Sequence, residues 1–409
     1  MLTLSVMAIL NIANVPKSFN NNKQRCARRI KNYIKRMIPM LSVKKMLVTM
    51  SQLGLLLSCV PAVYAADLLP LTKDIKPNVN NLPPAFVKPV KISVCFFDIQ
   101  GSSGEFYGRA KDIGLIAQRW NIKTDFKVFT DEALATESFK AGKCDAAVVS
   151  TLRARQFNKF MGSVNAIGGA PTYEHMRILL KSLFDAKLEK FAITEPYQVV
   201  GVFPIGAEYL HVRDQAMNSI ESLAGKKVSV MNGDASEAVM MEKMGLQATG
   251  ASIANFVRPF NNGEVDALVA PAMVYSPYEV QRGLGDKGGI YRTPVTQMVA
   301  SLIINREALK KKTTDLDSRV AAFHAITAEF LDQLLDRNLV TIERTEKEIP
   351  KKYWITLEPE NEKKFQEALR TTRIQMTKDG IYDARMMKLL KKVRCKIEPA
   401  AAECALTDE

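Results

Sequence analysis

FKAGKCDAAVV at residues 139–149 and FNNGEVDALVA at residues 260–270 are two copies of one pattern. Each copy reads Phe-x-x-Gly-x-x-Asp-Ala and continues into a short apolar run, which is typical of a strand buried in a parallel sheet. A further apolar strand leads each copy, at residues 92–99 for the first and 227–231 for the second. The duplication predicts two similar α/β lobes.

The glycine and the aspartate of this repeat have local structural explanations. A helix that ends at Phe139 or Phe260 needs a left-handed residue to turn back into the sheet, and glycine adopts that conformation at least cost. Asp145 and Asp266 are expected to accept hydrogen bonds from backbone N–H groups of the turn. We therefore place neither the glycines nor the aspartates in a ligand site.

The chain before the first copy alternates between strand and helix patterns. A strand at residues 91–99 precedes a helix at 105–120, a strand at 124–130 and a helix at 131–141, and the repeat supplies the next strand at 145–149. Helical segments in this stretch have apolar residues at helical spacing, whereas the strands are short apolar runs. Such alternation predicts a parallel sheet with right-handed crossovers.

Two further apolar stretches, at residues 197–212 and 297–305, are candidates for strands that cross between the lobes. An amphipathic helix with one apolar stripe follows at 315–337, and a second helical stretch at 360–393 is broken near Gly380. We predict an α/β protein with the two-lobed fold of periplasmic binding proteins, crossing hinge strands, and a long helix spanning both lobes. A separate sheet is expected in each lobe, with the strand ends of the two lobes facing each other across a gap.

The predicted parts follow one another along the chain. They are a non-native N-terminal extension (1–39), a signal peptide (40–65), an extended leader (66–90), lobe I with the spanning helix (91–203 and 297–350), lobe II (204–296), and a C-terminal helical tail (351–409).

The segment 40–65 has the three parts of a secretory signal peptide. Lys44 and Lys45 precede an apolar run at 46–60, and Ala65 closes a small-residue cleavage site. We expect cleavage after Ala65 and export to the periplasm. An uncleaved anchor and lipidation at a nearby cysteine are the alternatives.

The charge of the chain is concentrated at its N-terminus. Ten Lys and Arg residues and no acidic residue lie within 1–66, out of a net charge of +14, so the remainder is nearly balanced. This distribution gives no reason to propose a nucleic-acid partner. It also suggests that the true initiator is Met40 or Met37.

Four cysteines remain after the predicted cleavage, in a compartment that permits disulfides. Cys395 and Cys404 enclose a short loop and are expected to form a bridge that holds the tail. Cys95 and Cys144 lie in or beside predicted strands, where they form either a second bridge or two small buried apolar residues. We favour the second alternative for this pair, because nothing in the sequence fixes the register of their strands.

These motifs, in this order and spacing, resemble the extracytoplasmic solute-binding receptors of TRAP-type transporters, which have the periplasmic binding protein fold of type 2. The resemblance spans residues 90–340, and its segments are 127–134, 141–146, 223–230, 262–267 and the long helix after 303–305. It implies a small organic solute, membrane transporter subunits as partners, and a monomer. The family usually places an Arg in the strand that opens the second lobe, where it pairs with a substrate carboxylate. The matching residue here is Ser229, which marks a divergent member.

Ligands of open α/β sheets bind beyond the carboxyl ends of the strands, where helix N-termini present free N–H groups. The residues predicted to reach a ligand there are Asp98, Gln100, Ser102, Ser103, Ser150, Thr151, Arg153, Asn232, Asp234, Ser236, Pro271, Met273 and Tyr275.

Each kind of candidate also has a structural alternative. Ser102, Ser103, Asp234 and Ser236 are good helix N-caps. Arg153 is either a clamp for an anion or a solvated residue on a helix face. Tyr275 and Tyr278 either form an aromatic wall of the site or pack within their loop.

Motifs for catalysis or for metal binding are absent from the sequence. His175, His211 and His324 lie far apart, and there is no zinc-binding spacing, nucleophile elbow or phosphate-binding loop. We therefore expect a receptor without catalysis, cofactor or metal. A sensor or accessory module of another envelope system is the first alternative, and a hydrolase is the second.

Overall fold

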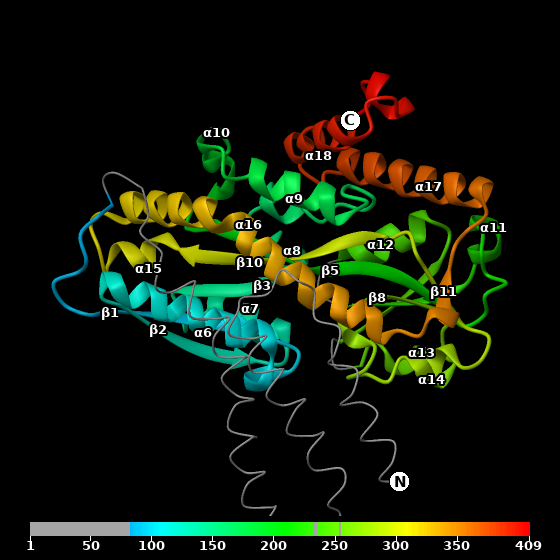
Figure 1. Cartoon of the computed structure of the whole chain (residues 1–409), viewed down its shortest axis with the longest axis horizontal. Helices are drawn as coiled ribbons and strands as arrows, with labels where there is room; N and C mark the ends of the chain where they lie inside the picture. The colour runs from blue at the N-terminus through cyan, green and yellow to red at the C-terminus, as the bar shows by residue number, and fades with distance from the viewer. Residues whose placement is uncertain (1–81, 232–234, 253–254) are drawn as a thin grey trace, which may run out of the picture. The chain divides into compact units, whose positions relative to one another are not determined.

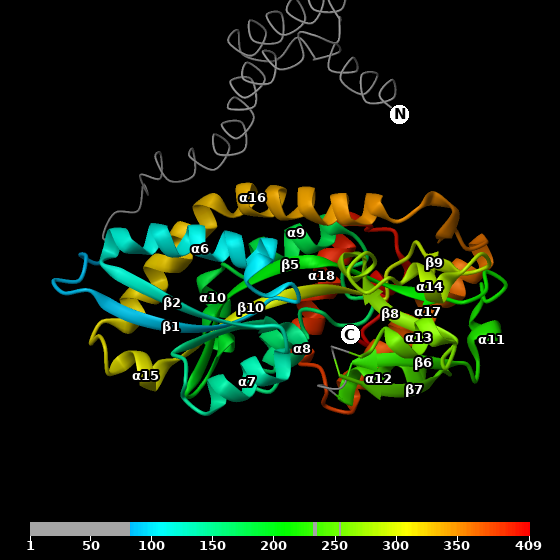
Figure 2. The same ribbon diagram turned by 90° about the horizontal axis from the view of Figure 1, so that it is seen from below.

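The computed structural model of the chain describes residues 82–231, 235–252 and 255–409. Within these residues eleven strands hydrogen-bond into one sheet, whose main path has the order β2-β1-β3-β10-β5-β8-β6-β7. Helices cover both faces of the sheet (Figures 1 and 2). No helix in the described part of the chain is long and apolar enough to cross a membrane.

The first lobe has the predicted alternation of strands and helices. Its strand β1 pairs in parallel with both β2 and β3. The helix after β2 begins at its N-cap Asp131, whose carboxylate accepts the N–H of Leu134 at 3.1 Å. The elements of this lobe are β1 (Val90–Phe97), α6 (Glu105–Ala117), β2 (Ile122–Phe129), α7 (Glu132–Lys140), β3 (Ala146–Ser150) and α8 (Thr151–Ala154).

The second lobe repeats the arrangement of the first. Its strand β6 pairs in parallel with both β7 and β8, as β1 does with its neighbours. The elements are α11 (Ile220–Leu223), β6 (Lys227–Met231), α12 (Ala235–Lys243), β7 (Gln247–Ala251), α13 (Arg258–Asn262) and β8 (Ala267–Pro271). The duplicated sequence pattern therefore corresponds to a duplicated strand-helix-strand unit.

The repeated glycine and aspartate perform the same tasks in both lobes. Gly142 and Gly263 have φ angles of +70° and +79°, the left-handed conformation predicted for them. Asp145 accepts the N–H of Ser93 at 2.7 Å, and Asp266 accepts the N–H of Lys227 at 2.9 Å. The predicted partner in the turn is wrong. Each aspartate instead reaches the neighbouring parallel strand, so it fixes the start of the repeat strand against the first strand of its lobe.

The strands β5 (Tyr197–Val212) and β10 (Thr296–Asn305) cross from one lobe to the other. The residues of β5 up to Glu208 pair with β10, and from Glu208 onward they pair with β8. The expectation of two separate sheets is therefore wrong. Hydrogen bonding continues from lobe to lobe because β5, with 16 residues, is long enough to serve both.

The helix α16 (Leu316–Glu348) contacts β5, α9 (Tyr173–Ser182) and the short turn after β8, so it touches both lobes. Figure 1 shows it running across the sheet. It extends beyond the predicted end at residue 337, although the added turns contain several β-branched residues. Burial of Thr341 and Ile342 and the hydrogen bonds of Glu346 to Tyr173 and Tyr209 hold these turns in place.

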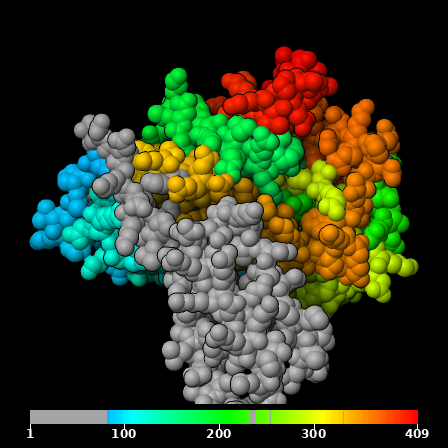
Figure 3. All heavy atoms as spheres, in the orientation of Figure 1, coloured from blue at the N-terminus to red at the C-terminus, as the bar shows by residue number. Residues whose placement is uncertain are grey.

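The C-terminal tail forms two helices, α17 (Pro359–Lys378) and α18 (Ala384–Ile397), separated at Gly380 as predicted. The first packs on α11 and α12 of lobe II, and the second packs on α9. Figure 3 shows the last residues, coloured red, at the surface of the protein.

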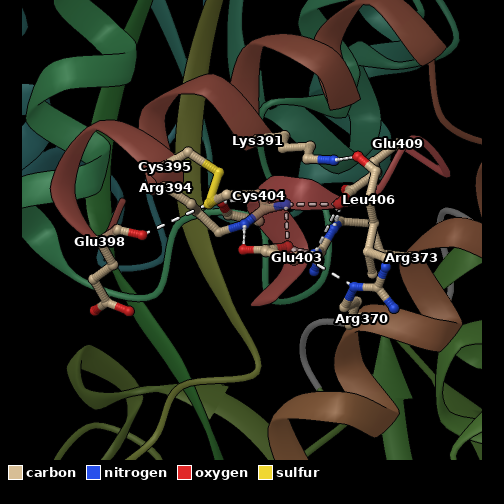
Figure 4. The surroundings of a disulfide bond; sticks show 11 residues. Arg370, Arg373, Lys391, Arg394, Cys395, Glu398, Glu403, Cys404, Leu406 and Glu409 are labelled. Carbon is tan, nitrogen blue, oxygen red and sulfur yellow. Dashed lines mark hydrogen bonds and ion pairs between the residues drawn. A yellow bond between two sulfur atoms is a disulfide. The ribbon is translucent and has the colours of Figure 1, made fainter. Parts of the chain in front are cut away.

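The end of the tail is held by a disulfide and by buried ion pairs (Figure 4). Cys395 and Cys404 form the expected bridge. Arg373 and Arg394 each form an ion pair with the side chain of Glu409, at 2.5 Å and 2.7 Å, and each donates to a backbone carbonyl of the loop before α9.

Cys95 and Cys144 also form a disulfide, and both are buried. The interpretation of these residues as two separate apolar side chains is therefore wrong. In the parallel register of β1 and β3, Cys95 lies opposite Ala147, and the Cα atom of Cys144, just before β3, is 5.7 Å from that of Cys95. That register is a tertiary property, which the pattern of apolar residues does not specify.

Candidate solute-binding site

The carboxyl ends of the strands in the two lobes point toward each other along β5. In lobe I, β3 ends at Ser150, opposite Ala300 of β10, which in turn pairs with Phe203 of β5. In lobe II, β8 runs antiparallel to β5 and ends at Pro271, opposite Glu208. The stretch of β5 from Phe203 to Glu208 therefore lies between the two sets of strand ends, which is the position where open α/β sheets bind ligands.

Glu208 is the distinctive residue of this stretch. Its side chain is 2% exposed, and its Oε1 atom has no hydrogen-bond partner among the described residues. Burial, together with the nearby charge of Glu132, raises the pKa of the Glu208 carboxyl to about 7. Its backbone carbonyl accepts the N–H of Val295 at 2.8 Å.

Glu132 lies in the first turn of α7 and is buried as well, but its carboxylate has partners. Oε1 accepts the backbone N–H of Ser150, and Oε2 lies 3.7 Å from Nε of Arg153. Burial raises the pKa of Glu132, and these contacts oppose the rise. The two acids therefore differ in their contacts. Both carboxylate oxygens of Glu132 have partners in lobe I, whereas Oε1 of Glu208 has no hydrogen-bond partner among the described residues.

Three of the predicted site residues gather around Glu132. Ser150 caps α8 by accepting the N–H of Arg153 at 3.4 Å, and Thr151 donates its hydroxyl to the carbonyl of Val299 at 3.1 Å. Arg153 forms its ion pair with Glu132. Pro271, at the end of the lobe II strand β8, pairs with Glu208 of β5. These four residues flank the stretch of β5 described above, and their contact with a solute stays a prediction.

The predicted residues after β1 have structural partners. The carboxylate of Asp98 accepts the N–H groups of Gln100 at 2.9 Å and of Tyr107 at 3.0 Å, and it packs against Gly104 so closely that a Cβ there would overlap it. Ser103 donates to the carbonyl of Gln100, and the side chains of Gln100, Ser102 and Ser103 are exposed. Asp98 therefore organises the turn into α6.

The lobe II candidates are distributed differently. Tyr275 is buried in the apolar core of that lobe with Phe260 and Val274, which favours packing over an aromatic wall. Met273 and Tyr278 are half-buried beside the same core. Asn232, Asp234 and the side chain of Ser236 lie outside the described residues.

Ser229, at the position where the resemblance leads one to expect an arginine, is fully buried in β6. Its hydroxyl donates to the carbonyl of Phe256 at 2.5 Å. This hydroxyl is engaged with lobe II itself, so Ser229 supplies neither a positive charge nor a free polar group to the strand ends.

A metal centre is not formed by the described residues, among which no group of three or more His, Cys, Asp or Glu side chains could hold an ion. His175, His211 and His324 bond separately to Thr172, to the carbonyl of Tyr209 and to the carbonyl of Val200. Burial is the main reason that the pKa of each histidine is lowered.

The site residues predicted from strand ends in the sequence include neither Glu132 nor Glu208. Glu208 does carry a signal in the sequence, because it is the only acidic residue in the 16-residue strand β5. Charged residues are almost never fully buried without a partner. A lone carboxylate in a strand that serves both lobes therefore indicates a functional position.

Comparisons with known proteins agree with this architecture. Residues 113–409 match the family model described as Solute-binding protein AdeT 1/2. The Acinetobacter baumannii protein named "Probable solute-binding protein AdeT1" is 37% identical over 313 residues, covering 76% of this chain and 100% of that protein. AdeT2 of the same organism is 23% identical over 247 residues, covering 60% of this chain and 100% of its own length.

A solved structure with the same fold is a TRAP periplasmic solute-binding protein from Haemophilus influenzae with bound L-gulonate. It has a TM-score of 0.60 at 10% identity, covering 75% of this chain and 99% of that one. The two-lobed fold predicted from the duplicated motif is thereby confirmed. Because the family model covers most of the chain and the full length of AdeT1 is matched, the chain belongs to the AdeT 1/2 family of solute-binding proteins.

Proposed function

We propose that this protein is an exported receptor that captures a small organic solute between its two lobes and delivers it to a membrane transporter. The observation that carries the proposal is the convergence of both sets of strand ends on β5 at Phe203–Glu208, where the buried Oε1 atom of Glu208 has no hydrogen-bond partner among the described residues. A ligand at this position contacts both lobes at once, so it favours their closed arrangement.

The cysteines support export to the periplasm. Both cysteine pairs in the described residues form disulfides, which persist in oxidising compartments. The signal peptide proposed at 40–65 lies outside the described residues.

The connections between the lobes support a hinge rather than two independent domains. The lobes share β5 and β10, and α16 packs across both. The carboxylate of Glu346 in α16 accepts the hydroxyl protons of Tyr173 in α9 and of Tyr209 in β5, so these three elements are fixed together. Opening is then confined to rotation of the strand-end regions about the shared strands.

Solute binding is expected to raise the melting temperature of the protein. A solute that binds only the folded state stabilises it by about 2.7 kcal/mol when its concentration is 100 times its Kd. For a chain of this size that corresponds to a shift of a few degrees. A thermal-shift screen of metabolites measures it, and mass spectrometry of the same mixtures checks that the solute is unchanged. A solute that is converted to product would contradict a purely binding role.

The exported protein is expected to begin at Ala66. Signal peptidase cleaves after small residues, and Ala65 follows Val63 at the spacing that the enzyme requires. N-terminal sequencing of the protein from a periplasmic extract measures the cleavage site. Recovery of material that keeps residues 1–39 would contradict both the cleavage site and the proposed start of translation.

A further inference from the structure

We infer that the solute carries a protonated amine whose N–H group donates to the free carboxylate oxygen of Glu208. This inference rests on the proposed function, because it assigns a chemical class to the ligand of the same site. It departs from the carboxylate clamp that the fold resemblance implies, in which an arginine pairs with an acidic ligand.

A few buried polar side-chain atoms have no hydrogen-bond partner among the described residues. Among the described residues these atoms belong to Gln198, Glu208, His211, Ser301 and Arg370. Glu208 supplies the only carboxylate oxygen of the set, and the only one placed between the strand ends of both lobes. An ionised carboxylate that is buried without a partner is destabilised by several kcal/mol. A hydrogen bond from a ligand therefore lowers the free energy more at this atom than at the neutral atoms of the set.

The described charged groups near Glu208 leave an excess of negative charge. Its neighbours across the sheet, Pro271 on β8 and Thr296 on β10, carry no charge. The charge that acts on Glu208 from the helices is the carboxylate of Glu132 on α7, and it is repulsive. The nearby Arg153 on α8 is within ion-pair distance of Glu132. With both acids ionised, one positive charge faces two negative charges among these described groups.

The charge balance around Glu208 favours a cationic ligand group over an anionic one. A carboxylate ligand would add a third negative charge beside Glu132 and Glu208, whereas an ammonium group brings the charge balance to zero. A quaternary ammonium would supply the charge without a donor. An amine with at least one N–H supplies both, and hydrogen bonds between ionised partners are the strong ones.

Binding of such an amine requires the ionised form of Glu208. Because burial and Glu132 raise the pKa of this carboxyl to about 7, the affinity for an amine is expected to increase with pH, by about tenfold per unit below that value. A carboxylate or carbonyl ligand would instead accept the proton of neutral Glu208, and its affinity would fall as the pH rises. The sign of the pH dependence thus separates the two ligand classes.

The test uses the full chain as the cell exports it and matched pairs of probes. The pairs are putrescine with succinate, cadaverine with glutarate, and tyramine with para-hydroxyphenylacetate. Thermal shift and calorimetric titration are run at about pH 5.5 and about pH 8 on the parent protein, on Glu208→Gln and on Glu307→Gln. Glu307 is an exposed acid on the short helix after β10, so its variant controls for the loss of one charge.

The expected result is that at least one amine stabilises the parent and binds more tightly at the higher pH. Glu208→Gln is expected to weaken that amine by about tenfold or more and to remove the pH dependence, whereas Glu307→Gln leaves both unchanged. The Gln variant retains the shape and the neutral state that burial favours, so it is expected to fold.

Three results would overturn the inference. They are stabilisation by the carboxylates alone, an amine affinity that falls with rising pH, and an amine affinity that Glu208→Gln leaves unchanged. Each of these leaves the receptor function intact, because a solute still binds. If instead no probe and no metabolite of any charge class stabilises the protein, the proposed receptor function fails as well.

Discussion

Glu208→Gln is expected to stabilise the ligand-free protein at about pH 8 while changing its stability little at about pH 4.5. The pKa of the Glu208 carboxyl is 4.5 in its reference state and is raised to about 7 in the folded protein, first by burial and then by Glu132. The folded state therefore binds more protons than the unfolded state between these values, so the parent loses stability as the pH rises through that window.

The size of this loss follows from the pKa difference and is about 3 kcal/mol at most. Glutamine does not titrate, so Glu208→Gln avoids the loss. Urea or thermal unfolding of both proteins, measured at several pH values between the two limits, gives the difference directly. The effect of burial on the pKa of Glu132 is common to both proteins, whereas the repulsion between Glu132 and Glu208 is lost in the variant and forms part of the measured difference.

A constant difference between the two proteins across this pH range would contradict the burial of an ionisable, unpartnered Glu208. Glu307→Gln is the matched control, since it removes one carboxylate from an exposed position and leaves the buried groups as they are. A residue that lowers stability in the absence of ligand is expected at a binding site, where function and stability are in conflict.

The repeated pattern at 139–149 and 260–270 predicted the lobes because each copy is a local unit. A helix end, a left-handed glycine and a buried strand lie within eleven residues, and neighbouring residues determine all three. The tertiary role of Asp145 and Asp266 is not local. Both aspartates contact a strand that lies at least 39 residues earlier in the chain, so only the assembled sheet shows that they tie two parallel strands together.

The candidate site was predicted less completely, for the same reason. Strand ends identify residues such as Ser150 and Pro271, because their position follows from where an apolar run stops. They do not identify Glu208, which lies inside a long strand and becomes a strand-end neighbour only through the pairing of β5 with β8. Asp98 is a polar residue at a strand end whose carboxylate accepts two backbone N–H groups of the turn, a structural role that its position in the sequence does not separate from ligand binding.

Loss of the Cys95–Cys144 bridge is expected to destabilise the protein more than loss of Cys395–Cys404. A disulfide restricts the unfolded chain, and the effect grows with the length of the closed loop. For sequence separations of 49 and 9 residues, the chain-entropy relation gives about 4 kcal/mol and about 2.5 kcal/mol. Denaturant unfolding of the two double alanine variants, Cys95→Ala with Cys144→Ala and Cys395→Ala with Cys404→Ala, measures both losses.

The two bridges also differ in their exposure to reductant. Cys95 and Cys144 are buried, whereas Cys395 and Cys404 are half-buried. Because thiol exchange requires access of the attacking thiolate to a sulfur atom, mild dithiothreitol treatment of the folded protein is expected to release the Cys395–Cys404 thiols alone. Thiol titration before and after unfolding measures this selectivity. Release of both pairs at the same rate would show that β1 and β3 separate readily enough to expose the Cys95–Cys144 sulfur atoms. That result would contradict a rigid lobe I beneath the proposed solute site.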